Sequence, residues 1–131
     1  MVVDSSALVA ILTGEPDRDL FIDAIADASD CVMSAFNHFE TRTVLLRRGG
    51  SGLLRQLERF IASSGIGLRA FDTLQAQLAF EAYQRFGKGS GHKAQLNLGD
   101  CPAYALAISL DLPLLYKGDD FRHTDVRSAL A

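Results

Sequence analysis

Short apolar segments alternate with helical stretches along this chain, and this alternation constrains its fold more than any other feature. The apolar segments have the length and composition of buried strands, and they lie at residues 2–3, 31–35, 66–71 and 113–116. Such strand–helix–strand units build a parallel sheet with helices on both faces. We therefore expect an α/β fold with four strands, and Val126 is a candidate start for a fifth strand at an edge.

The predicted helices have clear start and stop signals. Gly49-Gly50 interrupts a long helical stretch, and three glycines between residues 87 and 91 predict a flexible break. Asp72 or Thr73 is suited to cap a helix, and Pro102 fits only the first turn of the last helix. We expect helices at about residues 5–12, 15–28, 37–48, 51–64, 73–85 and 98–110.

Length and composition limit the class of protein. A chain of 131 residues suits one domain, and its high apolar content excludes intrinsic disorder. No apolar run reaches the ~20 residues of a membrane-spanning helix, and the opening residues lack the basic start of a secretory signal. We therefore expect a soluble cytoplasmic protein. Cys31 and Cys101 fit buried, reduced thiols better than a disulfide framework or a zinc ribbon.

Acidic residues follow two of the predicted strands. Asp4 comes directly after residues 2–3, and Asp119 and Asp120 come shortly after residues 113–116. Sites in parallel sheets with right-handed crossovers form beyond the carboxyl ends of the strands. We therefore expect these acids to leave the sheet at the same edge.

Two further acids are predicted to point inward from helices. Glu40 shares a helix face with Phe36, Phe39 and Val44, and an unpaired charge on an apolar face is costly. A buried ion pair with an arginine is the alternative explanation for Glu40. Asp100 begins the last helix on the face of Tyr104, although a favourable interaction with the helix dipole also explains an acid there.

Clustered carboxylates raise one another's pKa values or require a cation. An oxygen-only ligand set favours Mg²⁺ or Mn²⁺ over zinc. Such ions serve phosphodiester cleavage, so the acids predict a metal-dependent nuclease or phosphohydrolase. The formal net charge of −3 shows no overall basic footprint for nucleic acid. Basic residues are instead local, around residues 42–59 and again at residues 88–93.

Four segments resemble the motifs of PIN-domain ribonucleases, specifically the VapC toxins of bacterial toxin–antitoxin pairs. Residues 2–8, Val-Val-Asp-Ser-Ser-Ala-Leu, are similar to the first motif, and Glu40 corresponds to the second acid. Residues 96–101, Leu-Asn-Leu-Gly-Asp-Cys, together with residues 104–107 resemble the third motif. Residues 114–121, Leu-Leu-Tyr-Lys-Gly-Asp-Asp-Phe, with Thr124-Asp125 resemble the fourth. The four motifs occur in order over nearly the whole chain.

The resemblance implies a single PIN domain over residues 1–131. That fold is a three-layer α/β/α sandwich with a central, mostly parallel sheet of four or five strands. The resemblance further implies a Mg²⁺-dependent endoribonuclease, with Mn²⁺ as a substitute, that cleaves structured RNA such as tRNA or rRNA. It also implies a homodimer that is neutralised by a cognate VapB-type antitoxin.

The resemblance assigns roles to individual residues. Asp4 and Asp100 correspond to the direct metal ligands, and Ser6 corresponds to a hydroxyl that orients the first aspartate. Glu40 and one or both of Asp119 and Asp120 complete the acidic site, directly or through water.

The chain departs from this family at two places. Many members have Thr or Ser near the fourth acid, whereas this chain has Lys117-Gly118, which leaves open whether Asp119 or Asp120 faces the metal. Pro102 stands where an aromatic residue is common, and we expect it to alter packing rather than chemistry.

Phosphate contacts from basic side chains give RNA-binding proteins affinity and register. The candidates here are Lys88, His92, Lys93, Lys117 and Arg122. Two other functions fit the same residues. A related metal phosphohydrolase would act on DNA or small phosphate esters, which a side-by-side substrate assay separates. An inactive binding module would show no stabilisation by divalent metal.

Overall fold

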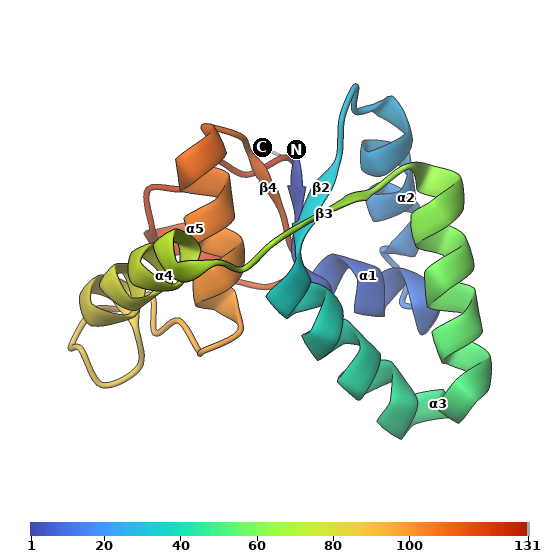
Figure 1. Ribbon diagram of the computed structural model, residues 1–131, viewed down its shortest axis with the longest axis horizontal. Coiled ribbons are helices and arrows are strands. Elements are labelled where there is room, and N and C mark those ends of the chain that lie inside the picture. The colour runs from blue at the N-terminus through green and yellow to red at the C-terminus, as the bar shows by residue number, and fades with distance from the viewer. Residues whose placement is uncertain (131) are drawn as a thin grey trace.

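The computed structural model describes residues 1–130 (Figure 1). Its strands are β1 (Val2–Val3), β2 (Val32–Ser34), β3 (Gly67–Arg69) and β4 (Leu114–Leu115). Its helices are α1 (Ser5–Leu12), α2 (Arg18–Asp27), α3 (Ala35–Ser64), α4 (Thr73–Phe86) and α5 (Asp100–Leu110), and a short 3₁₀ helix, η1 (Asp120–His123), follows β4. The predicted alternation of strands and helices is confirmed.

The four strands form one parallel sheet in the order β3-β2-β1-β4. Val2 is in register with Val32 on one side and with Leu114 on the other, so β1 is central. The chain moves from β1 through β2 to β3 in one direction and then places β4 on the opposite side of β1. The carboxyl ends of β1 and β4 therefore lie at a topological switch point, where open α/β sheets form their sites.

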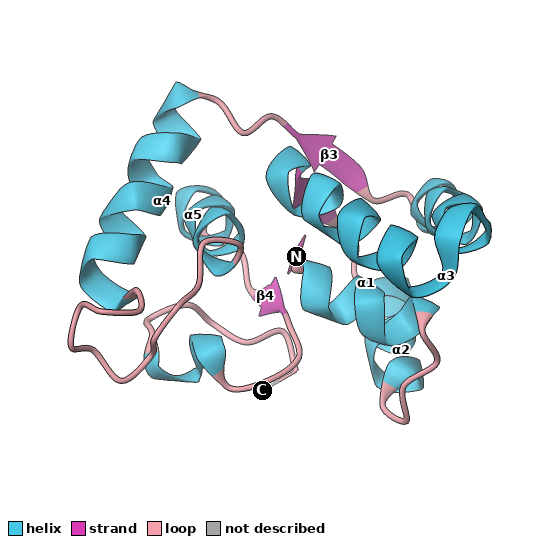
Figure 2. Ribbon diagram, turned by 90° about the horizontal axis from the view of Figure 1, so that it is seen from below, coloured by secondary structure: helices cyan, strands magenta, loops and turns pink. Residues whose placement is uncertain are grey.

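Helices cover both faces of the sheet, as the predicted three-layer sandwich requires. Alternate strand residues point to opposite faces, because side chains alternate along a strand. Val2 and Leu114 pack with α4 and α5, whereas Val3 and Leu115 pack with α1, α2 and α3. Figure 2 shows the same division, with α4 and α5 on one side of the strands and the other helices opposite.

Helix α3 bends sharply at the predicted Gly49-Gly50 break, and its two limbs diverge in Figure 1. Gly50 has φ 65° and ψ −153°, a conformation that is essentially restricted to glycine. The limb after the bend returns along α1 and buries Leu57 and Ile61 in the core beside it. Gly65, with φ 68°, then ends the helix in the left-handed conformation.

Three expectations about the fold are wrong. Val126 starts no strand, because the chain makes only an isolated bridge there, between Leu114 and Ser128. All three residues of β3 are exposed rather than buried, since β3 is an edge strand. Helix α2 begins at Arg18 instead of Glu15, because the backbone N–H of Glu15 still bonds to Ala10 O at 3.0 Å.

No helix within residues 1–130 has both the length and the apolar character needed to cross a membrane.

Replacing Gly50 tests the bend. Gly50→Ala should lower the free energy of unfolding by ~1–3 kcal/mol, because alanine is strained at this positive φ. Gly52→Ala is the matched control, since Gly52 is helical and a Cβ there meets no atom within 4 Å. It should be neutral or stabilise by up to ~1 kcal/mol. Urea unfolding measures both variants, and equal effects at the two positions would contradict the strain argument.

Candidate active site

Asp4 links the end of β1 to the start of α1. As the residue that caps α1, it accepts hydrogen bonds through Oδ2 from Ser6 N at 3.0 Å and from Ser6 Oγ at 2.5 Å. Its carboxylate is almost fully buried, with 2% of the residue exposed. Its other oxygen, Oδ1, is buried and finds no hydrogen-bond partner within residues 1–130. Ser6 therefore contacts Asp4 as the predicted orienting hydroxyl would, and one carboxylate oxygen is left available.

Asp100 lies in the first turn of α5 and is 8% exposed. Its Oδ2 accepts from Asn97 N at 3.0 Å, and its own N–H donates to Asn97 Oδ1 at 2.9 Å. This reciprocal pair has the pattern of a capping box, and it fixes the carboxylate at the helix start. Asp120 lies near enough to Asp100 to contribute to the raised pKa of the Asp100 carboxyl group.

Four of the five predicted acids meet at one cavity of about 310 Å³. The carboxylates in its wall come from the β1–α1 junction, α3, α5, the α1–α2 connection and η1, namely Asp4, Glu40, Asp100, Glu15 and Asp120. Asp119 is not among the lining residues. Its side chain is 85% exposed and lies 3.8 Å from the Arg122 guanidinium. The structure thus places Asp120, and not Asp119, in the acidic site.

Burial dominates the electrostatics of this cavity. It raises the pKa of Asp4 to about 6, and the charge of Glu40 adds to the increase while the Ser6 hydrogen bonds oppose it. Burial likewise raises the pKa of Asp100 to about 8, with Asp4 and Asp120 contributing further. Both carboxyl groups are therefore hard to ionise in the protein alone, and a bound cation would favour their charged forms.

Glu40 is held by polar neighbours that the sequence analysis did not single out. Its Oε1 accepts from Ser5 Oγ at 2.5 Å and from Asn37 Nδ2 at 3.2 Å. The alternative of an arginine partner is not observed within the described chain, where Arg42 lies 3.9 Å from Glu58 instead. The predicted apolar face is also only partly right, since Phe39 is 62% exposed.

Two signals in the sequence could have identified these neighbours. Asn37 precedes Glu40 by three residues, which places both on one helix face, and Ser5 directly follows Asp4.

Gly99, in the third motif, packs closely against the helix turn that carries Glu40, the acid of the second motif. The Asn37 amide donates to Gly99 O at 2.8 Å, and a Cβ built on Gly99 would overlap Glu40 Oε2. Gly99 has ordinary helical angles, so its role here is close approach rather than unusual backbone conformation. The glycine before Asp100 therefore allows the Glu40 carboxylate to reach the cavity.

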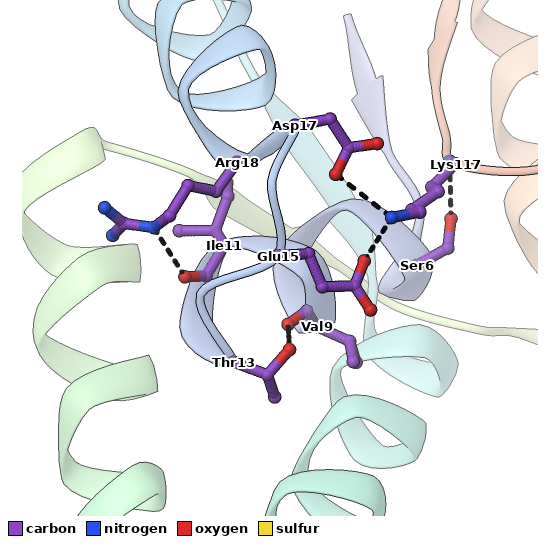
Figure 3. Close-up of polar contacts among 8 residues, drawn as sticks. All are labelled: Ser6, Val9, Ile11, Thr13, Glu15, Asp17, Arg18 and Lys117. Atoms are coloured by element: carbon purple, nitrogen blue, oxygen red, sulfur yellow. Dashed lines mark hydrogen bonds and ion pairs between the residues drawn. The ribbon is translucent and has the colours of Figure 1, made fainter.

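The predicted RNA-binding side chains are not gathered at the acids. Only one of the five lines the cavity, and its ammonium is not free: Lys117 Nζ binds Glu15 Oε2 and Asp17 Oδ1 (Figure 3). The other four, none of which lines the cavity, are Lys88, His92, Lys93 and Arg122. His92 packs its ring on Phe86, with centroids 4.9 Å apart. The Lys117 ammonium is therefore held by two carboxylates of the chain itself.

The donor set of the cavity suits a hard divalent ion. Carboxylate oxygens are the ligands that Mg²⁺ prefers, and the unpartnered Asp4 Oδ1 is a buried acceptor that such an ion would satisfy. No three His, Cys, Asp or Glu side chains of residues 1–130 already form a metal-binding group. A Mg²⁺ ion commonly keeps several waters and takes only one or two protein carboxylates, so the cavity fits this ion.

Comparison with known proteins assigns the family. The PIN domain family matches residues 1–127. The ribonuclease VapC42 of Mycobacterium tuberculosis is 43% identical over 129 residues, which cover 98% of this chain and 98% of that protein. This chain belongs to the VapC group of PIN domains. The match spans all four acidic segments, so the predicted resemblance is confirmed.

Solved structures support the same fold for this PIN domain. The crystal structure of Mycobacterium tuberculosis VapC20, described as a sarcin–ricin loop cleaving toxin, superposes with a TM-score of 0.76 at 18% identity. The alignment covers 96% of this chain and 98% of VapC20. A toxin–antitoxin complex from Klebsiella pneumoniae gives a TM-score of 0.69 at 16% identity, covering 95% and 92% of the two chains.

The raised pKa values predict how the stability of the metal-free PIN domain depends on pH. The folded state keeps protons on Asp4 and Asp100 to higher pH than the unfolded chain does. Their stabilising contribution is therefore complete below about pH 4 and is lost as the pH rises to about 8. For Asp4, the rise in pKa from 3.8 to about 6 corresponds to ~3 kcal/mol.

Urea unfolding in the presence of a chelator measures this dependence. The Asp100→Asn variant should lose less stability than the wild-type protein between about pH 4 and about pH 8. An identical pH dependence in the two proteins would show that Asp100 does not titrate as described.

Gly99→Ala tests the contact between the second and third motifs. The overlapping atoms belong to the end of the Glu40 side chain, so we expect the fold to survive and the Glu40 carboxylate to move away from Ser5 and Asn37. RNA cleavage should then fall, while the unfolding midpoint changes little. Gly67→Ala is the control, because a Cβ there makes only ordinary contacts, at 3.8 Å or more. Equal cleavage by both variants would rule out the proposed role of Gly99.

Proposed function

We propose that this PIN domain is a Mg²⁺-dependent endoribonuclease toxin that cleaves structured RNA, either tRNA or rRNA, and is neutralised by a cognate VapB-type antitoxin. The observation that carries the proposal is the meeting of Asp4, Asp100 and Asp120 at one cavity, with Asp4 Oδ1 left without a partner. Buried acids with raised pKa values are typical of functional sites. Mn²⁺ is expected to substitute for Mg²⁺, since both accept oxygen ligands.

Asp4 and Asp100 are the residues that would hold the ion, while Glu40 and Asp120 would orient its waters. The ion, when bound, supplies Lewis-acid activation of the attacking water and stabilisation of the leaving oxygen. Residues of the chain itself position these carboxylates. Ser6 and the N-terminus of α1 fix Asp4, Asn97 fixes Asp100, and Ser5 with Asn37 fixes Glu40.

The substrate class rests on relatives and on local charge. VapC42 is named a ribonuclease, and VapC20 is described as cleaving the sarcin–ricin loop, a structured RNA target. Lys88 and Lys93 are exposed in the connection before α5, and Arg122 is exposed beside the acids in η1. These cations, together with His92, are proposed to contact the RNA backbone.

The partners are proposed from the same relatives. The Klebsiella pneumoniae structure is a toxin–antitoxin complex with a similar fold, which supports an antitoxin for this chain. We further propose that the toxin acts in the cytoplasm as a homodimer, on the resemblance to VapC toxins.

Neighbouring aspartates provide a matched test of the metal site. Asp4→Asn, Asp100→Asn and Asp120→Asn should each reduce Mg²⁺-dependent RNA cleavage by at least ~100-fold, because each removes a carboxylate from the cavity. Asp119→Asn makes the same charge change at an exposed position and should retain most of the activity. Cleavage of total RNA by the purified variants, with and without a chelator, is the measurement.

Three results would refute the proposal. The first is full cleavage by both Asp4→Asn and Asp100→Asn. The second is cleavage that persists in the presence of a chelator. The third is a preference for DNA or for a small phosphate ester over RNA in parallel assays. Addition of the protein encoded by the neighbouring gene tests neutralisation, which should abolish cleavage by the wild-type toxin.

A further inference from the structure

Lys117, which follows β4, contacts both the start of α1 and the α1–α2 connection (Figure 3). Its backbone N–H donates to Ser6 Oγ at 2.9 Å, at the start of the helix. Its ammonium donates to Glu15 Oε2 and, at 3.0 Å, to Asp17 Oδ1, which both lie beyond the end of the helix. A single residue beyond β4 therefore contacts α1 at Ser6 and also the connection that follows this helix.

The segment that receives the ammonium is itself well anchored. Thr13 Oγ1 donates to Val9 O at 2.6 Å, and Arg18 Nε donates to Ile11 O at 3.2 Å (Figure 3). The N–H of Glu15 bonds to Ala10 O at 3.0 Å. Because these bonds tie the α1–α2 connection to α1, the two carboxylates give Lys117 a fixed anchor. The hydrogen bonds to these carboxylates also raise the pKa of Lys117, so its ammonium stays charged.

The contact at the start of α1 leads directly to the proposed metal ligand. Ser6 Oγ accepts from the Lys117 N–H, so its own proton is available for Asp4 Oδ2, 2.5 Å away. The Ser6 N–H donates to the same Oδ2 at 3.0 Å. Both donors therefore occupy Oδ2, and Oδ1 is the oxygen left without a partner. The orientation of the Asp4 carboxylate thus depends on where Ser6 Oγ is held.

We propose that Lys117 is a positioning residue for the proposed metal ligand Asp4 and that it acts through Ser6. Glu15 and Asp17 anchor the Lys117 ammonium, and this anchor holds the Lys117 backbone N–H over Ser6 Oγ. Asp4 Oδ1 then faces the cavity. This inference rests on the proposed metal-dependent function. It also gives Lys117 a role other than direct contact with RNA, which its two carboxylate partners disfavour.

The direction of the change in cation affinity distinguishes a positioning role of Lys117 from an effect of its charge. Lys117 lines the acidic cavity, so loss of its positive charge alone would make the cavity more negative and tighten cation binding. Loss of a positioning contact would instead weaken cation binding, and partners that orient metal ligands typically change affinity by about 10- to 100-fold. Lys117→Met therefore has opposite expected results under the two explanations.

Calorimetric titration of the metal-free protein with Mn²⁺ or Mg²⁺ provides the measurement and needs no RNA. Lys117→Met should weaken binding by about tenfold, and Lys117→Arg should restore most of the affinity because arginine can still pair with both carboxylates. Arg127→Met is the control for a lost positive charge, since Arg127 pairs with Asp111 away from the cavity. Unchanged or tighter binding by Lys117→Met would overturn the proposal.

A double-mutant cycle with Ser6→Ala tests the route of the effect. If Lys117 acts through Ser6, then Lys117→Met should cause little further loss of metal affinity in the Ser6→Ala background. Additive losses would show that Lys117 acts by another route. In the cleavage assay, Lys117→Met should raise the Mg²⁺ concentration needed for half-maximal activity and leave the KM for RNA unchanged. A change confined to the KM would indicate direct contact with RNA and would also overturn the proposal.

The two proposals can fail separately. Wild-type protein that binds no divalent ion would refute the metal-dependent function and this inference with it. Wild-type binding that Lys117→Met leaves unaltered would refute only the positioning role. The ion pairs of Lys117 are partly exposed, so their loss should leave the fold intact. Thermal unfolding checks this, and Lys117→Gln serves as a second variant with the same expected weakening.

Discussion

The burial of Asp4 where β1 meets α1 is the constraint on which the site depends. One oxygen of this carboxylate caps the helix and accepts both Ser6 donors, while the other has no partner within residues 1–130. Burial also raises the pKa of Asp4 to about 6. Asp100 and Asp120 then bring two further carboxyl groups to the same cavity. The folded PIN domain therefore holds clustered carboxyl groups in an arrangement that a nearby positive charge would stabilise in the ionised form.

The sheet explains why acids from distant parts of the chain meet. Because β1 pairs in parallel with both β2 and β4, the segments after all three strands emerge at one edge of the sheet. Asp4 follows β1, Glu40 lies in the helix after β2, and Asp120 follows β4. Asp100 joins them from the first turn of α5, which packs on the same strands. The close approach of Glu40 to Gly99 completes the arrangement, since it allows two helices to present their carboxylates to a common cavity.

The sequence predicted the parts of this arrangement that follow from local pattern. The strand–helix order, the bend at Gly50 and the convergence of the acids all came from apolar segments, glycines and strand ends. It could not separate Asp119 from Asp120, because tertiary packing decides which of these two adjacent residues lines the cavity, and here Phe121 beside them is buried in the core. The pairing of Lys117 with Glu15 and Asp17 joins residues about a hundred positions apart. No local pattern predicts such a contact, so the sequence alone did not reveal the carboxylate partners of Lys117.

The order of the sheet has a consequence for how the acidic cavity is assembled. β4 and Asp120 come after β3, α4 and α5 along the chain, yet β4 lies beside β1 in the sheet. Until this segment joins the sheet, Asp120 is absent from the cavity and Lys117 makes no contact with Ser6. The cavity is therefore completed only when β4 pairs with β1, so a partly folded domain carries an incomplete acidic site.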